Sequence, residues 1–497
     1  MNNKATSERL PTGIVGLDYI LKGGLPKNRL HLVEGSPGTG KTTLGLQFLL
    51  EGARRGEKGL YITLSESGEE LVAVAESHGW SLDNIVIKDL TQSGDSLMDN
   101  SNYTVFHPSE VELDEATRAV LDEVERVNPV RVVFDSLSEM RMLASEPLRF
   151  RRQILALKQY FLTRNCTVLL LDDRTLNDSD RQLESIAHGV LILEYVPVEY
   201  GRQRHTIRVV KMRGIKFHSG SHDFNIESGG LVVFPRLAPE RKVDFAPGEL
   251  GTGNASLDEL IGGLHYGTST ILLGPAGVGK STLSMMYAAA AAERGERAAV
   301  YLFDEGTDTL YQRTAALGID IKKHVDAGLI LLRQIQLAEL TPGELSHMIS
   351  VEVEENKARV VIIDSVNGYL MATPQERFLT MQFHELLAYL NRNGVVSILV
   401  VGQYGLIGNM QAPIDMSYLA DSVVLLRYFE AGGSVRQAIS MLKKRTGDHE
   451  RTIRQYKMGQ GGLQLGDPLT DFHGVLTGVP VYRGKSGGLM TDGESNE

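Results

Sequence analysis

Short apolar runs alternate with longer amphipathic segments along this chain. In the first part of the sequence an apolar run at 58–64 precedes amphipathic segments at 69–78 and 117–127, and a further apolar run follows at 131–134. Short apolar runs predict buried strands, and segments with helical periodicity predict helices that cover them. The alternation therefore predicts an α/β fold in which a mostly parallel sheet is flanked by helices.

The same ordered series of segments occurs twice. The segment 12–18 (TGIVGLD) returns at 252–258 (TGNASLD), and a Gly-Gly-Leu tripeptide follows in both places. Further on, the apolar run that ends in Asp135-Ser136 matches the run that ends in Asp364-Ser365. A repeat of this length predicts two domains of the same fold in tandem.

Chain length agrees with that division, because 497 residues exceed the roughly 100–200 residues of a typical domain. Three prolines and mixed charge between 234 and 248 indicate a linker, and the chain ends in a segment rich in Gly, Ser and acidic residues. The predicted parts are a first domain over 1–236, a linker over 237–248, a second domain over 249–478 and a flexible tail over 479–497.

Composition narrows the class of protein. Hydrophobic residues make up 42% and charged residues 23%, which is typical of a globular protein with large cores. The single cysteine, Cys166, excludes an internal disulfide and suits a reducing compartment. No apolar run approaches the ~20 residues that span a bilayer, and the first ten residues lack the apolar stretch of a signal peptide. We therefore expect a cytoplasmic protein without a membrane partner.

The formal net charge of −11 bears on nucleic-acid binding. Non-specific binding to nucleic acid depends on many contacts between Lys or Arg and phosphate. A chain with net negative charge disfavours such binding, although this net charge does not exclude a local basic channel. We therefore expect no nucleic-acid partner.

Two glycine-rich loops carry the clearest chemistry. Residues 35–42 read GSPGTGKT and residues 274–281 read GPAGVGKS, so both satisfy G-x-x-x-x-G-K-[ST]. Each loop follows an apolar run and opens a helical pattern, which is the order of a phosphate-binding loop. Backbone N–H groups and the helix N-terminus bind phosphate oxygens there, the lysine reaches the β- and γ-phosphates, and the last hydroxyl ligates Mg²⁺. A glycine-rich turn that binds nothing is the alternative.

These loops predict two nucleotide sites. Their expected phosphate- and Mg²⁺-binding residues are Gly38, Thr39, Gly40, Lys41, Thr42 and Thr43 in the first half, and Gly277, Val278, Gly279, Lys280, Ser281 and Thr282 in the second half.

One aspartate in each half ends an apolar run. From that position Asp135 and Asp364 can help to hold Mg²⁺ together with the loop hydroxyls of Thr42 and Ser281. A single aspartate after a strand is commonly a turn or cap residue instead. Recurrence at equivalent positions favours the metal-binding interpretation.

Acidic residues also follow the next apolar run in each half. Glu66 ends the sequence YITLSE, and Asp304-Glu305 end YLFDE. We predict Glu66 and Glu305 as general bases that activate water, and Asp304 as a second catalytic acid. Exposed loop acids are the alternative. Because Ser65 stands where the second half has Asp304, the two sites need not behave alike.

Cations recur late in both halves. Lys211 and Arg213 follow a β-like segment, and Lys443 and Arg445 follow its repeat. Alternation along a strand would place each pair on one face. Phosphoryl transfer develops charge that a cation from a neighbouring subunit can stabilise. We therefore predict that these four residues act on a neighbour's nucleotide, with a solvated strand edge as the alternative.

Taken together, these motifs resemble the KaiC family of tandem RecA-like ATPases over nearly the whole chain. The shared features are the two loops, the Gly-Gly-Leu segments, the acids after the second strand, the Asp-Ser pairs and the late Lys-x-Arg motifs. The resemblance implies two RecA-like P-loop NTPase domains, ATP, ADP and Mg²⁺ as ligands, slow hydrolysis, and a homohexamer of stacked rings with ATP between subunits. Whether six or twelve chains assemble stays open.

Further residues take roles only through this resemblance. Ser77 and Trp80 fall where the first domain of the family contacts the base or ribose, with a core role as the alternative for Trp80, and Leu317 replaces the aromatic residue of the second domain. Ser417-Tyr418 stands where clock members carry the adjacent Ser and Thr that become phosphorylated. Ser417 is therefore a candidate phosphoacceptor, and a structural serine is the alternative.

Three functions fit these observations. The leading hypothesis is a KaiC-like ATPase with Ser/Thr autokinase activity in the second domain, which signals or keeps time through protein partners. A RecA- or DnaB-like nucleic-acid motor uses the same core, but negative charge and the lack of a visible basic arm or stacking series argue against it. The third is an interaction scaffold in which ATP joins subunits.

Overall fold

A strand that leads into a glycine-rich loop and a helix lies at the centre of each half. In the first half β3 (Leu30–Gly35) precedes α2 (Lys41–Arg54), and in the second β14 (Ser269–Gly274) precedes α9 (Lys280–Glu293). Gly40 and Gly279 directly precede the helices with φ of 88° and 103°. Side chains disfavour this left-handed conformation, which explains glycine there.

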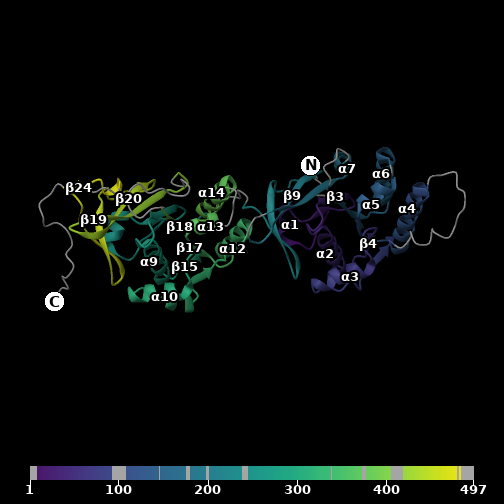
Figure 1. Cartoon of the computed structure of the whole chain (residues 1–497). Helices are drawn as coiled ribbons and strands as arrows, with labels where there is room; N and C mark the ends of the chain where they lie inside the picture. The colour runs from purple at the N-terminus through teal and green to yellow at the C-terminus, as the bar shows by residue number, and fades with distance from the viewer. Residues whose placement is uncertain are drawn as a thin grey trace, which may run out of the picture. The chain divides into compact units, whose positions relative to one another are not determined.

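The computed structural model describes residues 8–91, 108–144, 146–174, 180–197, 201–237, 244–336, 339–371, 376–403, 418–477 and 481–482. They form two compact units, of which the first comprises 1–199 with 203–236 and the second comprises 200–202 with 237–497. Figure 1 shows the first in purple to teal and the second in teal to yellow. Part of the predicted linker and nearly all of the predicted tail lie outside the described residues.

The first unit contains the following elements besides β3 and α2. Its strands are β1 (Arg9–Leu10), β2 (Leu25–Pro26), β4 (Gly59–Thr63), β5 (Ile85–Asp89), β6 (Arg131–Asp135), β7 (Thr167–Asp173), β8 (Gly189–Val196), β9 (Arg204–Met212), β10 (Ser221–Glu227) and β11 (Gly230–Phe234). Its helices are α1 (Val15–Ile20), α3 (Gly68–Ser77), α4 (Pro108–Val127), α5 (Leu137–Ala144), α6 (Pro147–Thr163) and α7 (Asp180–Ile186).

The second unit repeats the series. Its further strands are β12 (Glu249–Leu250), β13 (Leu264–His265), β15 (Arg297–Leu302), β16 (Ile330–Gln334), β17 (Ala358–Asp364), β18 (Val396–Gly402), β19 (Ser422–Ala431), β20 (Ser434–Lys444), β21 (Arg454–Gly459), β22 (Gly462–Pro468), β23 (Phe472–His473) and β24 (Val481–Tyr482). Its further helices are α8 (Ala255–Ile261), α10 (Thr307–Ala316), α11 (Ile321–Asp326), α12 (Pro342–Glu354), α13 (Val366–Met371), α14 (Glu376–Arg392) and the 3₁₀ turn η2 (Val475–Thr477).

Each unit is built on one large sheet with the same strand order. Over the described residues the first sheet has nine strands in the order β11-β10-β9-β8-β3-β7-β6-β4-β5, and the second has nine in the order β22-β21-β20-β19-β14-β18-β17-β15-β16. The strands from β8 to β5 and from β19 to β16 run parallel, and the rest are antiparallel. These matched orders confirm the predicted mostly parallel sheets and tandem RecA-like domains.

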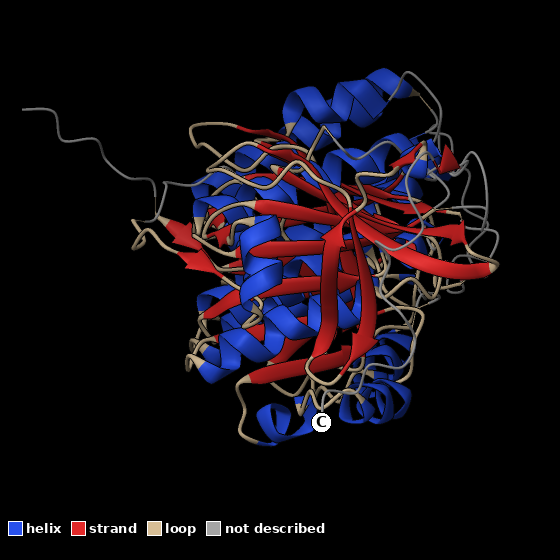
Figure 2. Ribbon diagram, turned by 90° about the vertical axis from the view of Figure 1, so that its left-hand side faces the viewer, coloured by secondary structure: helices blue, strands red, loops and turns tan. Residues whose placement is uncertain are grey.

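Helices cover both faces of each sheet. In the first unit Leu32 and Val33, neighbours on β3, join different apolar cores, one with α4 to α6 and one with α2 and α3. Figure 1 shows α2 and α3 on one side of the strands and α5 and α6 on the other. Figure 2, coloured by secondary structure, shows red strands with blue helices packed around them. Strands buried on both faces read as continuous apolar runs, which made them recognisable in the sequence.

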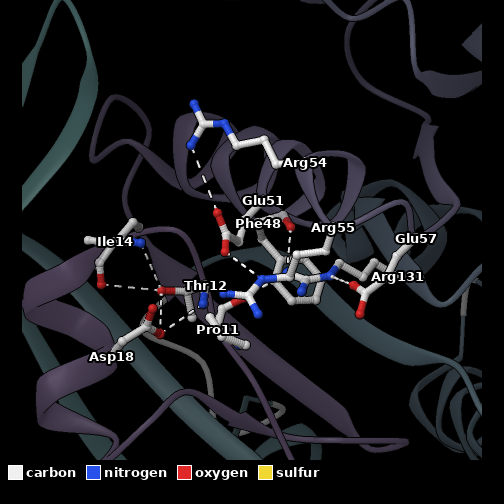
Figure 3. Close-up of polar contacts among 10 residues, drawn as sticks. All are labelled: Pro11, Thr12, Ile14, Asp18, Phe48, Glu51, Arg54, Arg55, Glu57 and Arg131. Carbon is white, nitrogen blue, oxygen red and sulfur yellow. Dashed lines mark hydrogen bonds and ion pairs between the residues drawn. The ribbon is translucent and has the colours of Figure 1, made fainter.

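The repeated turn before α1 and α8 has the same hydrogen bonds in both units. Thr12 donates to Asp18 Oδ1 from its N–H and hydroxyl at 2.8 and 2.9 Å (Figure 3), and Thr252 donates likewise to Asp258 Oδ1 at 2.6 and 2.8 Å. The two units therefore share side-chain geometry as well as topology.

The first unit contains a fully buried arginine with three hydrogen bonds. Arg131 on β6 is 0% exposed; its Nε donates to Glu57 at 2.6 Å, and its Nη1 donates to the carbonyls of Pro11 and Phe48 at 2.7 and 2.8 Å (Figure 3). Burial lowers the pKa of Arg131, while the contact with Glu57 opposes the shift.

We expect Arg131→Ala to lower the free energy of unfolding of the first unit by about 3–5 kcal/mol, because the partly buried Glu57 carboxylate and the carbonyls of Pro11 and Phe48 lose their donor. Urea unfolding followed by the fluorescence of Trp80, the single tryptophan, reports on this unit. Arg55→Ala is the matched control, since Arg55 pairs with Glu51 at the surface and such pairs contribute about 1 kcal/mol or less. Equal effects of both substitutions would contradict the structural role of Arg131.

No helix within the described ranges is both long and apolar enough to cross a membrane.

Candidate functional site

The carboxyl ends of three parallel strands bring the predicted residues of the first half together. Gly35 at the end of β3 lies opposite Asp173 on β7, and Asp135 on β6 lies opposite Leu171 on β7. This edge of a parallel sheet is where α/β proteins commonly bind ligands. The loop 36–40 therefore opens beside two strand-end aspartates.

Lys41 and Thr42 in the first turn of α2 contact those two aspartates. Lys41 Nζ lies 2.8 Å from Asp173 Oδ1 and donates to the Gly35 carbonyl at 2.8 Å. Thr42 Oγ1 donates to Asp135 Oδ2 at 3.2 Å. The lysine, the loop hydroxyl and the strand-end carboxylate that the sequence predicted thus lie together.

The carboxylates of the first site lie in a desolvated environment. Asp135 is 5% exposed and accepts a hydrogen bond from Tyr61 OH at 2.6 Å. Burial raises the pKa of Asp135, and the hydrogen bonds from Tyr61 and Thr42 oppose that rise. Burial, with the nearby charge of Asp135, also raises the pKa of Glu66. In the described part of the chain, Glu66 Oε2 is buried and has no hydrogen-bond partner.

The second loop repeats the arrangement with different partners. Lys280 Nζ donates to the Pro275 carbonyl at 2.7 Å, and burial lowers the pKa of Lys280 to about 8 against the opposing effect of Asp364. Burial raises the pKa of Asp364 to about 6, and a hydrogen bond from Ser281 opposes that rise. The position of Asp173 is taken here by Gly402, which lies opposite Gly274.

The raised pKa of Asp364 predicts that the stability of the second unit depends on pH. The ordinary pKa of 3.8 applies to unfolded Asp364, so the folded unit holds this proton more tightly and becomes less stable as pH rises from about 4 to about 6. We expect Asp364→Asn to stabilise the second unit by about 2–3 kcal/mol at pH 8 without Mg²⁺ or nucleotide, and by little at pH 4.

Hydrogen exchange tests whether Asp364→Asn stabilises the unit more at pH 8 than at pH 4. Peptides that span β17 are followed at both pH values, with correction for the intrinsic exchange rate. Asp326→Asn, at the exposed end of α11, serves as the control. An Asp364→Asn variant that is destabilised at pH 8 would contradict the burial argument.

Glu305 and Asp304 contact different partners after β15. Arg313 on α10 donates to both carboxylate oxygens of Glu305, from Nε at 3.1 Å and from Nη2 at 2.8 Å. Ser365, which follows Asp364, donates to Asp304 Oδ2 at 2.5 Å. The second site therefore has two acids with separate contacts where the first has Glu66 and an exposed Ser65.

The late cations lie away from the loop of their own half. Arg213 N donates to the His188 carbonyl and His188 N donates to Leu30, at the start of β3. The phosphate loop begins after Gly35, about 17 Å further along at the usual rise per residue. Arg445 N donates in the same way to Asp421, whose N–H donates to Ser269 at the start of β14.

The side chains of these cations bind carbonyl groups and a carboxylate at that edge. Lys211 Nζ donates to the Glu184 carbonyl and Arg213 Nη2 to Ser185 at 3.0 Å. Lys443 Nζ donates to Ala420 at 2.7 Å, and Arg445 pairs with Asp421 at 3.3 Å. Arg213 and Arg445 lie one residue beyond the ends of β9 and β20. Each still contacts a residue next to the one that its lysine contacts, namely Ser185 beside Glu184 and Asp421 beside Ala420.

Ser77 and Trp80 lie at the end of α3. Ser77 is exposed and its hydroxyl donates to the Val74 carbonyl, while Trp80 is partly buried against the first unit's core. Trp80 N donates to Ala75, as Ile319 N donates to Thr314. The structural counterpart of Trp80 is therefore Ile319 rather than Leu317, and it is likewise not aromatic.

Ser417 lies outside the described residues, which resume at Tyr418. Arg445 Nη2 donates to the Tyr418 carbonyl at 3.1 Å, so the residue next to Ser417 contacts one of the late cations.

Two side chains of these sites were missed by sequence reasoning. Asp173 contacts the loop lysine, and its position as the last residue of a buried strand next to β3 was the available signal. Arg313 contacts Glu305 across eight residues, and no motif marks such a pair.

A family model described as KaiC ATPase matches residues 10–238 and 250–469. The chain belongs to the KaiC family of ATPases. Circadian clock protein KaiC3 of Synechocystis sp. is 26% identical over 500 residues, covering 96% of both chains. The circadian clock oscillator protein KaiC of Picosynechococcus sp. is 27% identical over 483 residues, covering 95% of this chain and 92% of that protein. Membership of the KaiC family supports nucleotide binding and ATPase activity for this chain.

Proposed function

We propose that each half binds Mg²⁺-ATP at its glycine-rich loop and hydrolyses it to ADP and phosphate. The observation that carries this proposal is the repeated meeting of a loop lysine, a loop hydroxyl and a strand-end aspartate, shown most directly by the 3.2 Å contact of Thr42 with Asp135. In this proposal the residues 38–43 and 277–282 bind the phosphates, and Ser77 with Trp80 contacts the base or ribose in the first half.

The residues present suit Mg²⁺. Asp364 Oδ2 is buried and, as far as the described residues go, has no hydrogen-bond partner, although a carboxylate in that position is best stabilised by a cation. No cluster of three or more His, Cys, Asp or Glu able to hold a metal occurs among them. Mg²⁺ would therefore depend on Asp135 with Thr42, or Asp364 with Ser281, together with ATP oxygens, which is its usual mode. When bound, it neutralises charge on the β- and γ-phosphates.

Hydrolysis needs water to lose a proton as its oxygen attacks the γ-phosphorus. Glu66 and Glu305 follow the strands beside the Asp135 and Asp364 strands, so they can accept that proton while the bond to the β-phosphate oxygen breaks. Burial and the charge of Asp135 raise the pKa of Glu66, which makes its carboxylate a stronger base than an ordinary glutamate. Asp304, held by Ser365, would orient water or metal in the second half.

The place of the late cations supports the completion of each site by a neighbouring subunit. In their own half Lys211, Arg213, Lys443 and Arg445 lie at the edge opposite the phosphate loop, so a role in catalysis requires another copy of the chain. We propose a homohexamer of stacked rings in which these residues reach the neighbour's ATP. Its nucleotide state would inform protein partners in the cytoplasm, as a signalling or timing ATPase.

Nucleotide content tests the proposal. Protein purified in Mg²⁺ and ATP should retain close to two nucleotides per chain, and native mass spectrometry should show a hexamer or dodecamer that dissociates when nucleotide is removed. A stable monomer that retains ATP would exclude the role of the neighbouring subunit. Tight, salt-dependent retention of single-stranded DNA on a filter would instead support the nucleic-acid motor.

Autophosphorylation of Ser417 is a second proposed activity. It is supported by the contact of Arg445 with Tyr418, because a cation that reaches a neighbour's ATP would bring the adjoining serine with it. The Ser417 oxygen would attack the γ-phosphorus, ADP would leave, and Glu305 would accept the hydroxyl proton. Label from γ-labelled ATP should appear in the chain and disappear in Ser417→Ala. ATP hydrolysis without label would leave an ATPase or ATP-dependent scaffold only.

A further inference from the structure

One ion pair of the second half has no counterpart among the described residues of the first. Arg313 and Glu305 are half-buried, with 29% and 25% of their side chains exposed, and two hydrogen bonds join them. A carboxylate held by two N–H groups of a guanidinium is fixed in position, because moving toward a water molecule would lose that charge-assisted contact. The base proposed for the second half is therefore restrained within its own unit.

The same guanidinium also touches the phosphate loop helix. Arg313 Nη1 donates to Thr282 Oγ1 at 2.7 Å. Thr282 follows Ser281 in the first turn of α9, where phosphate oxygens approach a helix N-terminus. Arg313 thus contacts the Glu305 carboxylate on one side and, through Thr282, the helix N-terminus at which nucleotide phosphates would bind.

The first half lacks this cation. Ala75 and Thr314 are equivalent, since they accept from Trp80 N and Ile319 N, which makes Val74 the counterpart of Arg313. Glu66, the counterpart of Glu305, has a buried Oε2 without a hydrogen-bond partner in the described part of the chain. An apolar residue therefore leaves the first base unrestrained.

We propose that Arg313 is a positioning residue that still restrains Glu305 after ATP has bound and must exchange it for a phosphate oxygen before water can be activated, so that hydrolysis in the second half depends on release of the ion pair. This inference rests on the proposed function of the second loop. Exchange adds a phosphate contact while it frees the base, so the same side chain both holds nucleotide and slows its turnover. The first half, without the restraint, hydrolyses ATP faster per site.

Arg313→Gln tests the restraint in the full-length chain. Lys41→Ala is included to silence the first site, so that turnover reports on the second. We expect kcat to rise about threefold to tenfold, the range of a partly exposed ion pair, and KM to rise by a similar factor because a phosphate contact is lost. Arg313→Lys keeps a positive charge, so its KM should lie between that of the chain with Arg313 and that of Arg313→Gln. Loss of a merely structural contact would lower kcat and could not raise both constants.

Two matched variants complete the test. Arg294→Gln removes a cation of the same half that donates to the Glu249 carbonyl, and should change neither constant. Val74→Arg, in a chain silenced by Lys280→Ala, should install the restraint on Glu66 and lower kcat about threefold or more, with Trp80 fluorescence as the check on folding.

The outcomes separate the two proposals. If the Lys41→Ala chain retains ATP but Arg313→Gln leaves kcat unchanged or lower, the restraint is wrong and the ATPase proposal stands. If that chain retains no ATP at all, the proposed second site is wrong and the restraint falls with it. A higher kcat for Arg313→Gln together with a lower kcat for Val74→Arg supports the exchange.

Discussion

Lys41→Ala and Lys280→Ala should each reduce the ATP retained by the chain from two molecules to one, and the double variant should retain none. Each lysine lies in the first turn of a loop helix and contributes charge-assisted contacts worth about 1.5–3 kcal/mol each. Loss of two such contacts lowers affinity about 100-fold or more. Extraction and chromatography of nucleotide from rapidly desalted protein measures the stoichiometry.

Loss of the loop lysine should lower ATP affinity more in the first half than in the second. Without Lys41, the Asp173 carboxylate that it neutralises at 2.8 Å would face the phosphates. Lys41→Ala with Asp173→Asn should therefore regain part of the lost affinity. Lys58→Ala and Lys357→Ala serve as controls, because these lysines donate to backbone carbonyls at 3.2 and 2.5 Å and lie outside both loops. Undiminished retention by the Lys41 and Lys280 variants would refute the phosphate-binding assignment.

The fold could be predicted from sequence because it depends on features that are local and strong. Apolar runs gave strands such as β4 and β6 nearly to the residue, and the helix predicted over 69–78 appears as α3. The duplication added a constraint, since a motif that recurs in the same order must serve one architecture twice. The helix predicted over 117–127 was too short, because α4 begins at Pro108 in a more polar segment.

Parts of the candidate site could not be predicted, because they depend on contacts between distant residues. The pairing of Lys41 with Asp173 arises only when β7 lies beside β3. Sequence indicated that the two sites differ through Ser65 and Asp304, whereas the structure places a further difference at Val74 and Arg313.

We expect Arg213→Ala and Arg445→Ala to abolish most hydrolysis while each half still retains ATP. A cation that reaches the transition state from a neighbour contributes about 10³-fold or more to kcat, because charge develops on the transferred phosphoryl group. Ground-state ATP is already held by the loop, so retention should fall little. The loop-lysine variants should differ from these arginine variants, because they lose ATP retention itself.

Mixing of subunits shows whether these arginines act between chains. With the second loop silenced by Lys280→Ala, chains that also carry Lys41→Ala and chains that also carry Arg213→Ala should each be inactive alone. Joint reassembly with ATP should recover activity, because an interface that combines an intact loop with a neighbour's Arg213 is then complete. Lys216→Ala replaces an exposed cation close to Arg213 in sequence and should leave kcat unchanged. If no mixture recovers activity, the arginine acts within its own chain, and the sheet edge at which it lies would then require a different catalytic arrangement from the one proposed.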